Sequence, residues 1–304
     1  MPQEKVICLD TGSTGLAGAV FDPETGSISK PVGLALNPSA EGREIIDSIV
    51  AGIKHLWPQG QNALRVAMTF PAPMRFSKGV FEGVDPLYYG SLAGVNLRDQ
   101  VTTAFKHIFN IDVRFYNKAQ AFLCAEVVGG RAKEYSQVIG IHLGRTIDGA
   151  FFSRPLFLRE ADELRGVPAE GCVRDMSYAD AFLHEFVSET FLEQSYASQS
   201  GQSVKIKEMS ALARNQESAA SMTFGDYATH IGKGLFEVVQ KFKPEAVVFG
   251  GKISRAFDVI EPILSEIWDE LPSKPKLLVT RDPVLAPLIG AGLLYIGEKS
   301  RNVP

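Results

Sequence analysis

The sequence lacks an excess of positive charge and any long basic run. Its 304 residues include 31 Lys and Arg against 35 Asp and Glu, which gives a formal net charge of −4. A surface that binds a nucleic-acid backbone or an anionic membrane usually carries an excess of basic side chains. We therefore expect neither nucleic acid nor a membrane to be a main partner of this protein.

Cysteine is scarce, and long apolar runs are missing. The three cysteines, Cys8, Cys124 and Cys172, are widely separated, and the first two have apolar neighbours. Such a pattern is typical of reduced thiols in a core. No uncharged apolar run is long enough to cross a bilayer, and no basic region followed by an apolar stretch marks a secretory signal. The sequence predicts a cytoplasmic protein.

The N-terminal segment, residues 6–22, combines two apolar runs with a polar turn between them. The first run ends in Asp10-Thr11-Gly12-Ser13-Thr14. A strand that enters a turn rich in backbone N–H groups and hydroxyls can surround an anion, and a carboxylate beside it can hold a divalent cation through water. An ordinary β-hairpin with a glycine turn fits the same residues equally well.

The rest of the chain alternates between strand and helix patterns, which indicates an α/β protein. In the first half we expect helices at 41–57, 97–109 and 119–128, strands at 64–70 and 112–116, and an aperiodic loop at 75–94. A second strand–turn–strand follows at 137–152. After it we expect helices at 178–194, 224–242, 256–271 and 288–296, and strands at 245–251 and 277–280.

Three motifs in this order resemble those of the ROK family, a branch of the sugar-kinase/actin/heat-shock ATPase superfamily that contains sugar kinases and related transcriptional repressors. The segment Asp10-Thr11-Gly12-Ser13-Thr14 is similar to the first phosphate motif of the family, Asp-x-Gly-x-Thr. The adenosine motif is matched by Val247-Val248-Phe249-Gly250-Gly251-Lys252-Ile253-Ser254, and the closing helix by Leu288-Ile289-Gly290-Ala291-Gly292-Leu293-Leu294. The resemblance extends from residue 6 to about residue 298.

The resemblance implies a two-lobe actin-like ATPase (ribonuclease-H-like) fold, in which each lobe is a mixed sheet flanked by helices. We expect the N-terminal lobe at residues 1–117 plus 288–304 and the C-terminal lobe at 118–287. The resemblance also implies ATP and Mg²⁺ as cofactors, with Asp10 organising the metal and two residues, Asn117 and Glu163, binding the sugar. The residues implied to hold the nucleotide are Gly12, Ser13, Thr14, Gly144, Arg145, Gly250 and Gly251.

The most important departure from the family pattern is Tyr116-Asn117-Lys118. Kinases of the family have Glu-Asn-Asp here, and the Asp accepts the proton of the sugar hydroxyl. Lys118 thus replaces the catalytic Asp and cannot act as that base while it is protonated. General-base catalysis is worth about 10²–10⁴-fold in rate. Lys118 could instead bind an anionic group of a ligand, or it could be a solvated residue at the start of a helix.

Two further departures concern the second turn and zinc. The second turn reads Gly144-Arg145-Thr146-Ile147-Asp148-Gly149, where the family has more glycine. Its Arg145 could contact phosphate or fill the space that a nucleotide needs. Many members of the family bind zinc through a His and a cluster of cysteines, but only Cys172 stands in this region. A single cysteine cannot build a tetrahedral thiolate site, so we expect no zinc.

Two functions remain open. The first is an ATP-dependent hexose kinase of the glucokinase type, with Asp10 and the substituted position Lys118 at its catalytic centre. The second is a non-catalytic relative that binds sugar or nucleotide and signals through closure of its lobes. Because the first strand is expected at residue 6, we expect no DNA-binding helix-turn-helix ahead of it, which disfavours the repressor branch. We expect a homodimer.

Overall fold

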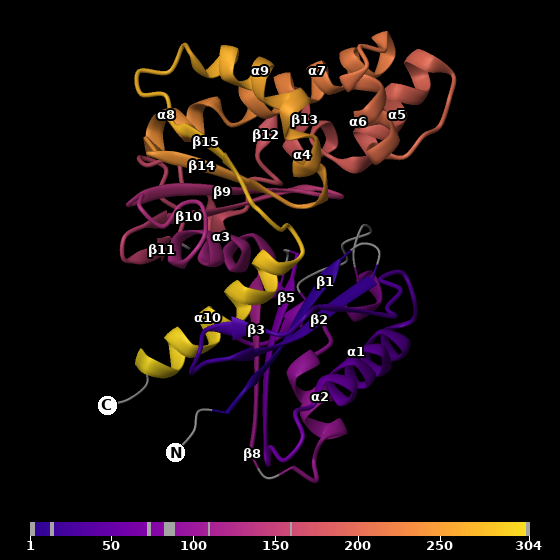
Figure 1. Ribbon diagram of the computed structural model, residues 1–304, viewed down its shortest axis with the longest axis vertical. Helices are drawn as coiled ribbons and strands as arrows, with labels where there is room; N and C mark the ends of the chain where they lie inside the picture. Colours follow the sequence, from indigo (N-terminus) through magenta and orange to yellow (C-terminus); the bar gives the residue numbers. More distant parts are fainter. Residues whose placement is uncertain are drawn as a thin grey trace. The chain divides into compact units, whose positions relative to one another are not determined.

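The computed structural model describes residues 4–12, 15–71, 74–81, 89–108, 110–158 and 160–301 (Figure 1). The chain divides into two compact units. Unit 1 comprises Met1–Ala125 with Val284–Pro304, and unit 2 comprises Glu126–Pro283. None of the helices in the described part of the chain is long and apolar enough to cross a membrane.

Unit 1 is built on a mixed six-stranded sheet with the order β3-β2-β1-β5-β8 and with β4 paired to β2. Strands β1 and β2 form an antiparallel hairpin, whereas β1, β5 and β8 run parallel. The strands are β1 (Val6–Gly12), β2 (Gly15–Asp22), β3 (Ser27–Ile28), β4 (Val32–Leu34), β5 (Ala63–Phe70) and β8 (Asn110–Asn117). The helices of this unit are α1 (Gly42–Leu56), η1 (Gly90–Leu92), α2 (Leu97–Ala104) and α10 (Leu285–Arg301), together with α3 (Lys118–Val128) as far as Ala125.

The two faces of this sheet are covered by different helices (Figure 1). The apolar side chains of α1, among them Ile45, Ile49 and Ile53, pack with Ile7 and Leu9 of β1 in one core. Helix α10 packs on β1, β5 and β2. Its glycines permit a close approach, because a Cβ at residue 290 would overlap the backbone of α3 and one at residue 292 would overlap a phenylalanine ring of β2. The small residues of the closing helix thus serve close packing.

Unit 2 repeats this topology with the strand order β11-β10-β9-β14-β15. Its strands β9 and β10 form the antiparallel hairpin, and β9, β14 and β15 run parallel. The strands are β9 (Gln137–Leu143), β10 (Ile147–Ser153), β11 (Leu156–Leu158), β14 (Ala246–Gly250) and β15 (Lys276–Val279). The helices are η2 (Ala169–Gly171), α4 (Leu183–Phe186), α5 (Glu189–Ser200), α6 (Ile206–Arg214), α7 (Ser218–Gly234), α8 (Phe236–Phe242), η3 (Lys252–Ala256) and α9 (Phe257–Trp268), and α7 packs against α5, α6 and α9.

Some predicted elements are wrong. The helix expected at 178–194 is instead the strand pair β12 (Ser177–Tyr178) and β13 (Ala181–Phe182), followed by α4 and α5, because Ser188 caps a new helix by accepting the Phe191 N–H at 3.1 Å. The helix expected at 224–242 starts earlier and is divided into α7 and α8, and α6 was not predicted at all. The loop expected at 75–94 contains β6 (Met74–Arg75), β7 (Val80–Phe81) and η1, while residues 82–88 lie outside the described residues.

Candidate functional site

Asp10 lies near the end of β1. One of its carboxylate oxygens accepts a hydrogen bond, and the other forms an ion pair. The Thr69 hydroxyl donates to Oδ1 at 2.5 Å, and the Lys118 ammonium lies 3.0 Å from Oδ2. Asp10 is buried, with 8% of its surface exposed. A carboxylate that has left water must be compensated by such partners, and here one neutral donor and one cation supply the compensation.

Lys118 reaches Asp10 because of the way the sheet is built. Strands β1, β5 and β8 are parallel neighbours, so their carboxyl ends meet at one edge, and Lys118 begins α3 directly after β8. Its Nζ also donates to the Thr11 carbonyl at 3.0 Å. Only 15% of the Lys118 side chain is exposed. Lys118 is therefore an ion-paired residue of the sheet edge rather than a solvated residue at the start of a helix.

Gly12 and Asn117, two other predicted residues of unit 1, are the last residues of β1 and β8. The Gly12 carbonyl accepts a hydrogen bond from the Tyr89 hydroxyl at 3.2 Å. Asn117 is buried, and its side-chain oxygen accepts the Gln120 N–H at 3.0 Å, so it caps the first turn of α3. Ser13 and Thr14, both predicted to bind the nucleotide, lie outside the described residues.

In unit 2 the predicted nucleotide-binding residues meet at the carboxyl ends of two neighbouring strands. Gly250 of β14 is paired with His142 of β9, two residues before the turn that begins at Gly144. Gly251 has a φ of +84°, and a Cβ there would overlap the Leu143 carbonyl oxygen. Only glycine lets the two strand ends approach so closely. Gly144, Arg145, Gly250 and Gly251 thus lie on one edge of the second sheet.

Glu163, the remaining candidate, and Cys172, the cysteine of the region where the family binds zinc, also belong to unit 2. Glu163 is exposed on the turn closed by the hydrogen bond from the Val167 N–H to the Asp162 carbonyl at 2.9 Å. Within the described ranges, no group of three or more His, Cys, Asp or Glu residues is arranged to hold a metal ion. Burial, together with nearby carboxylates, raises the pKa of the Cys172 thiol to about 12, which disfavours the thiolate that a metal would need.

The model of the ROK family matches residues 6–154 and 180–294 of this sequence. The chain belongs to the ROK family. No curated protein sequence matches it.

Solved structures of ROK proteins have the same fold. A ROK hexokinase from Thermus thermophilus shares 20% sequence identity, with 98% of this chain and 100% of that chain covered and a TM-score of 0.74. A ROK glucokinase from Streptomyces griseus in complex with glucose and AMPPNP shares 20% identity, with 96% and 99% covered and a TM-score of 0.77. A ROK transcriptional regulator, a homologue of the E. coli MLC protein, shares 16% identity, with 96% and 78% covered and a TM-score of 0.77. These likenesses confirm the predicted α/β fold of the two-lobe actin-like ATPase type.

The hydrogen bonds of three residues, Thr69, Tyr89 and Glu126, were not predicted in this ROK protein. Thr69 stands at the end of β5 opposite Asp10 and donates to its carboxylate. The sequence contained a signal for Thr69, since this residue lies at the end of the strand expected at 64–70, just before a proline. The Tyr89 hydroxyl comes from a segment without periodicity. In unit 2, Glu126 is buried and accepts hydrogen bonds from the Thr280 hydroxyl at 2.6 Å and the Arg131 N–H at 2.8 Å.

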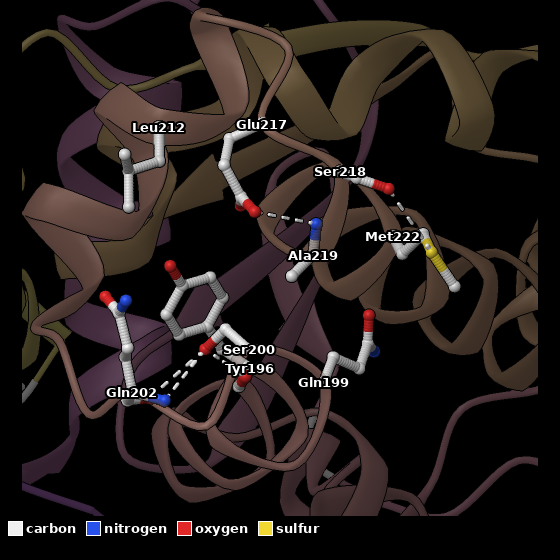
Figure 2. Close-up of a pocket in the computed structure, with 9 residues that line it drawn as sticks. All are labelled: Tyr196, Gln199, Ser200, Gln202, Leu212, Glu217, Ser218, Ala219 and Met222. Atoms are coloured by element: carbon white, nitrogen blue, oxygen red, sulfur yellow. Dashed lines mark hydrogen bonds between the residues drawn. The ribbon is translucent and has the colours of Figure 1, made fainter.

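A separate hollow of the ROK protein lies in unit 2 among α5, α6 and α7 (Figure 2). Its most polar lining residue is Glu217, whose carboxylate accepts the N–H groups of Ala219 at 3.1 Å and Ala220 at 2.7 Å. Glu217 therefore caps α7. None of the predicted site residues lines this hollow, so we do not assign it to the nucleotide or the sugar.

Proposed function

We propose that this ROK protein binds a sugar and an adenine nucleotide but does not transfer phosphate between them at the rate of a kinase. The single observation that carries the proposal is the ion pair at 3.0 Å between the Lys118 ammonium and Asp10 Oδ2. The ligand classes are supported by family membership and by the glucose and AMPPNP bound to the Streptomyces griseus glucokinase.

Lys118 removes the step in which a base accepts the proton of the sugar hydroxyl. A lysine ammonium has three N–H donors and no acceptor, so it cannot take that proton. The loss of a general base costs about 10²–10⁴-fold in rate. Lys118 also occupies the carboxylate of Asp10, which the family resemblance assigns to the metal. The substitution therefore affects proton transfer and charge neutralisation together.

Mg²⁺ does not fit the residues around Asp10 as they stand. Mg²⁺ takes oxygen ligands at about 2.0–2.1 Å in octahedral geometry. Here Oδ1 accepts the Thr69 hydroxyl at 2.5 Å, and Oδ2 faces a cation at 3.0 Å. A second cation on the same carboxylate would be repelled by the ammonium. The proposed function therefore includes no metal-dependent step.

Ligand binding is assigned to the residues that the sequence singled out. In unit 2 the nucleotide is bound by the edge that carries Gly144, Arg145, Gly250 and Gly251, where backbone groups are accessible without a Cβ. Gly12 of unit 1, together with Ser13 and Thr14, binds the phosphates of the nucleotide. Asn117 and Glu163 bind the sugar. We also propose that the protein is a homodimer, which light scattering on the purified chain tests.

Two measurements on the purified protein test the proposal together. Calorimetry with ATP and with each sugar of a hexose panel should show binding. A coupled assay of ADP release over the same panel should show no turnover above that of Asp10→Asn. Turnover that Asp10→Asn abolishes would overturn the proposal and make the protein a kinase. Absence of both binding and turnover would overturn the ligand assignment.

An active sugar kinase is the second candidate, and a specific observation favours it. Asp10 and Asn117, two polar residues that the family uses, are kept at the ends of β1 and β8. Phosphoryl transfer also depends more on positioning and charge stabilisation than on a base. Under this candidate Lys118→Asp should increase turnover by about 10²-fold or more over a measurable basal rate.

A further inference from the structure

We propose that the ammonium of Lys118 takes the place of the divalent cation at Asp10, so that this protein binds its phosphate-bearing ligand without metal. The inference rests on the proposed function for its ligand, but the state of Asp10 can be tested separately. Position 118 carries a lysine here, whereas the kinases of the family have an aspartate.

Both oxygens of the Asp10 carboxylate already have a partner within unit 1. The Thr69 hydroxyl and the Lys118 ammonium each bind one of its oxygens, at 2.5 Å and 3.0 Å. The Thr69 contact is itself fixed, because the Thr11 hydroxyl donates to the Thr69 carbonyl at 2.7 Å and ties β1 to β5 at this point. The carboxylate is thus held in one orientation by neighbouring strands, with its charge already neutralised.

The ammonium of Lys118 lies close to Gly12, where the predicted phosphate turn begins. A Cβ placed on Gly12 would lie 3.7 Å from Lys118 Nζ, so the cation lies beside the backbone that enters the predicted phosphate turn. Lys118 is also the first residue of the 11-residue helix α3, whose N-terminus carries a partial positive charge. Placing a lysine there is unfavourable for the helix alone, and the pairing with Asp10 offsets that cost.

The ammonium of Lys118 has more N–H donors than it uses among the described residues. Among the described residues, Nζ contacts two oxygens, Asp10 Oδ2 and the Thr11 carbonyl. Since an ammonium has three N–H groups, one remains for a ligand oxygen. A lysine binds phosphate as a point charge, without the geometric demands of a hydrated metal. The ammonium can therefore bridge Asp10 and a phosphate, which is the electrostatic part of what a metal does.

The test for Asp10 uses the full chain and Mn²⁺ alone, with the free ion followed by electron paramagnetic resonance. We expect no Mn²⁺ site in the wild type at millimolar metal, and a new site in Lys118→Asp that disappears when Asp10→Asn is added. Lys118→Gln, which removes the charge at similar size, provides a second variant if Lys118→Asp fails to fold. Binding of Mn²⁺ to the wild type that Asp10→Asn abolishes would overturn the inference.

The test for the ligand uses ATP in calorimetry, with excess EDTA or with Mg²⁺. We expect the wild-type Kd to change by no more than about twofold between the two conditions, and Lys118→Gln to lose about tenfold in affinity in EDTA. Lys54→Met, which removes an exposed lysine of α1 in the same unit, should leave the Kd unchanged. A wild-type Kd that weakens about tenfold or more in EDTA would overturn the inference. Failure to bind ATP in either condition would overturn the proposed function instead, and the Mn²⁺ result would still decide the state of Asp10.

Discussion

The ion pair between Asp10 and Lys118 predicts a specific pattern of stability in a double-mutant cycle. The Asp10 side chain is only 10% exposed, and replacing Lys118 with Met leaves its carboxylate bound by the Thr69 hydroxyl alone. Removing one partner of a buried ion pair typically costs about 3–5 kcal/mol. The retained bond to a charged acceptor and the small exposure of the site reduce that cost, so we expect a loss of ~2–3 kcal/mol.

The second arm of the cycle removes both charges. The double variant Asp10→Asn/Lys118→Met leaves no uncompensated charge at the sheet edge. Replacing both members of a buried ion pair by uncharged groups often changes the free energy of unfolding little. We therefore expect the double variant to lose about 1 kcal/mol. Asp10→Asn alone should cost at least about 1 kcal/mol, because it leaves the largely buried Lys118 ammonium without its carboxylate, so the coupling energy between the two positions should be about 2 kcal/mol or more.

Urea denaturation can measure the cycle in unit 1 by itself. The chain has two tryptophans, Trp57 of unit 1 and Trp268 of unit 2, so in a Trp268→Phe background the fluorescence reports unit 1. Lys54→Met, at an exposed position of α1, is the matched control and should stay within about 0.5 kcal/mol of the parent. Single variants that also stay within about 0.5 kcal/mol, with no coupling, would show a solvated surface pair and refute the reasoning.

Three other features give predictions. Gly251→Ala should destabilise unit 2 by about 3 kcal/mol or more in urea unfolding, because a Cβ there adds an overlap with the backbone to the strain of a positive φ. Gly201→Ala, at a positive φ with open space around it, should cost about 1 kcal/mol. Equal costs for the two variants would contradict the close approach at residue 251. Because burial lowers the pKa of His230, the fold favours its neutral form, so Tm should fall as the pH drops below about 6.5, and His230→Gln should flatten that slope; an unchanged slope would be contrary evidence. Burial raises the pKa of Cys124 and of Cys172 to about 12, so a disulfide reagent at pH 8 should label them only after unfolding, and rapid labelling of the native protein would oppose this.

The fold was predictable where the sequence pattern was local and strong. The hairpin at 6–22, the helix at 41–57 and the strand at 64–70 correspond to β1 with β2, α1 and β5. The helix expected at 178–194 failed because its apolar spacing ignores the polar residue that caps α5 within it, Ser188. Helical periodicity describes which side chains face a core, but it does not say where hydrogen bonding to a side chain ends one helix and begins another.

The candidate site residues could be named from motifs, but the contacts between them could not be predicted from the sequence. Asp10 and Lys118 were singled out separately, 108 positions apart, from a motif and from a departure from it. That they touch depends on the sheet order, which places β5 between β1 and β8 and lets a long side chain reach across the strand ends. The role of Thr69 depends on strand register in the same way. Neither order nor register can be read from a single sequence pattern.

The most direct measurement of the central claim is the anomalous scattering of Mn²⁺ in a crystal grown with AMPPNP. The account predicts no manganese peak on the carboxylate of Asp10, with Lys118 Nζ within hydrogen-bonding distance of both that carboxylate and a phosphate oxygen. A manganese peak on Asp10, with the Lys118 side chain displaced from it, would contradict the account.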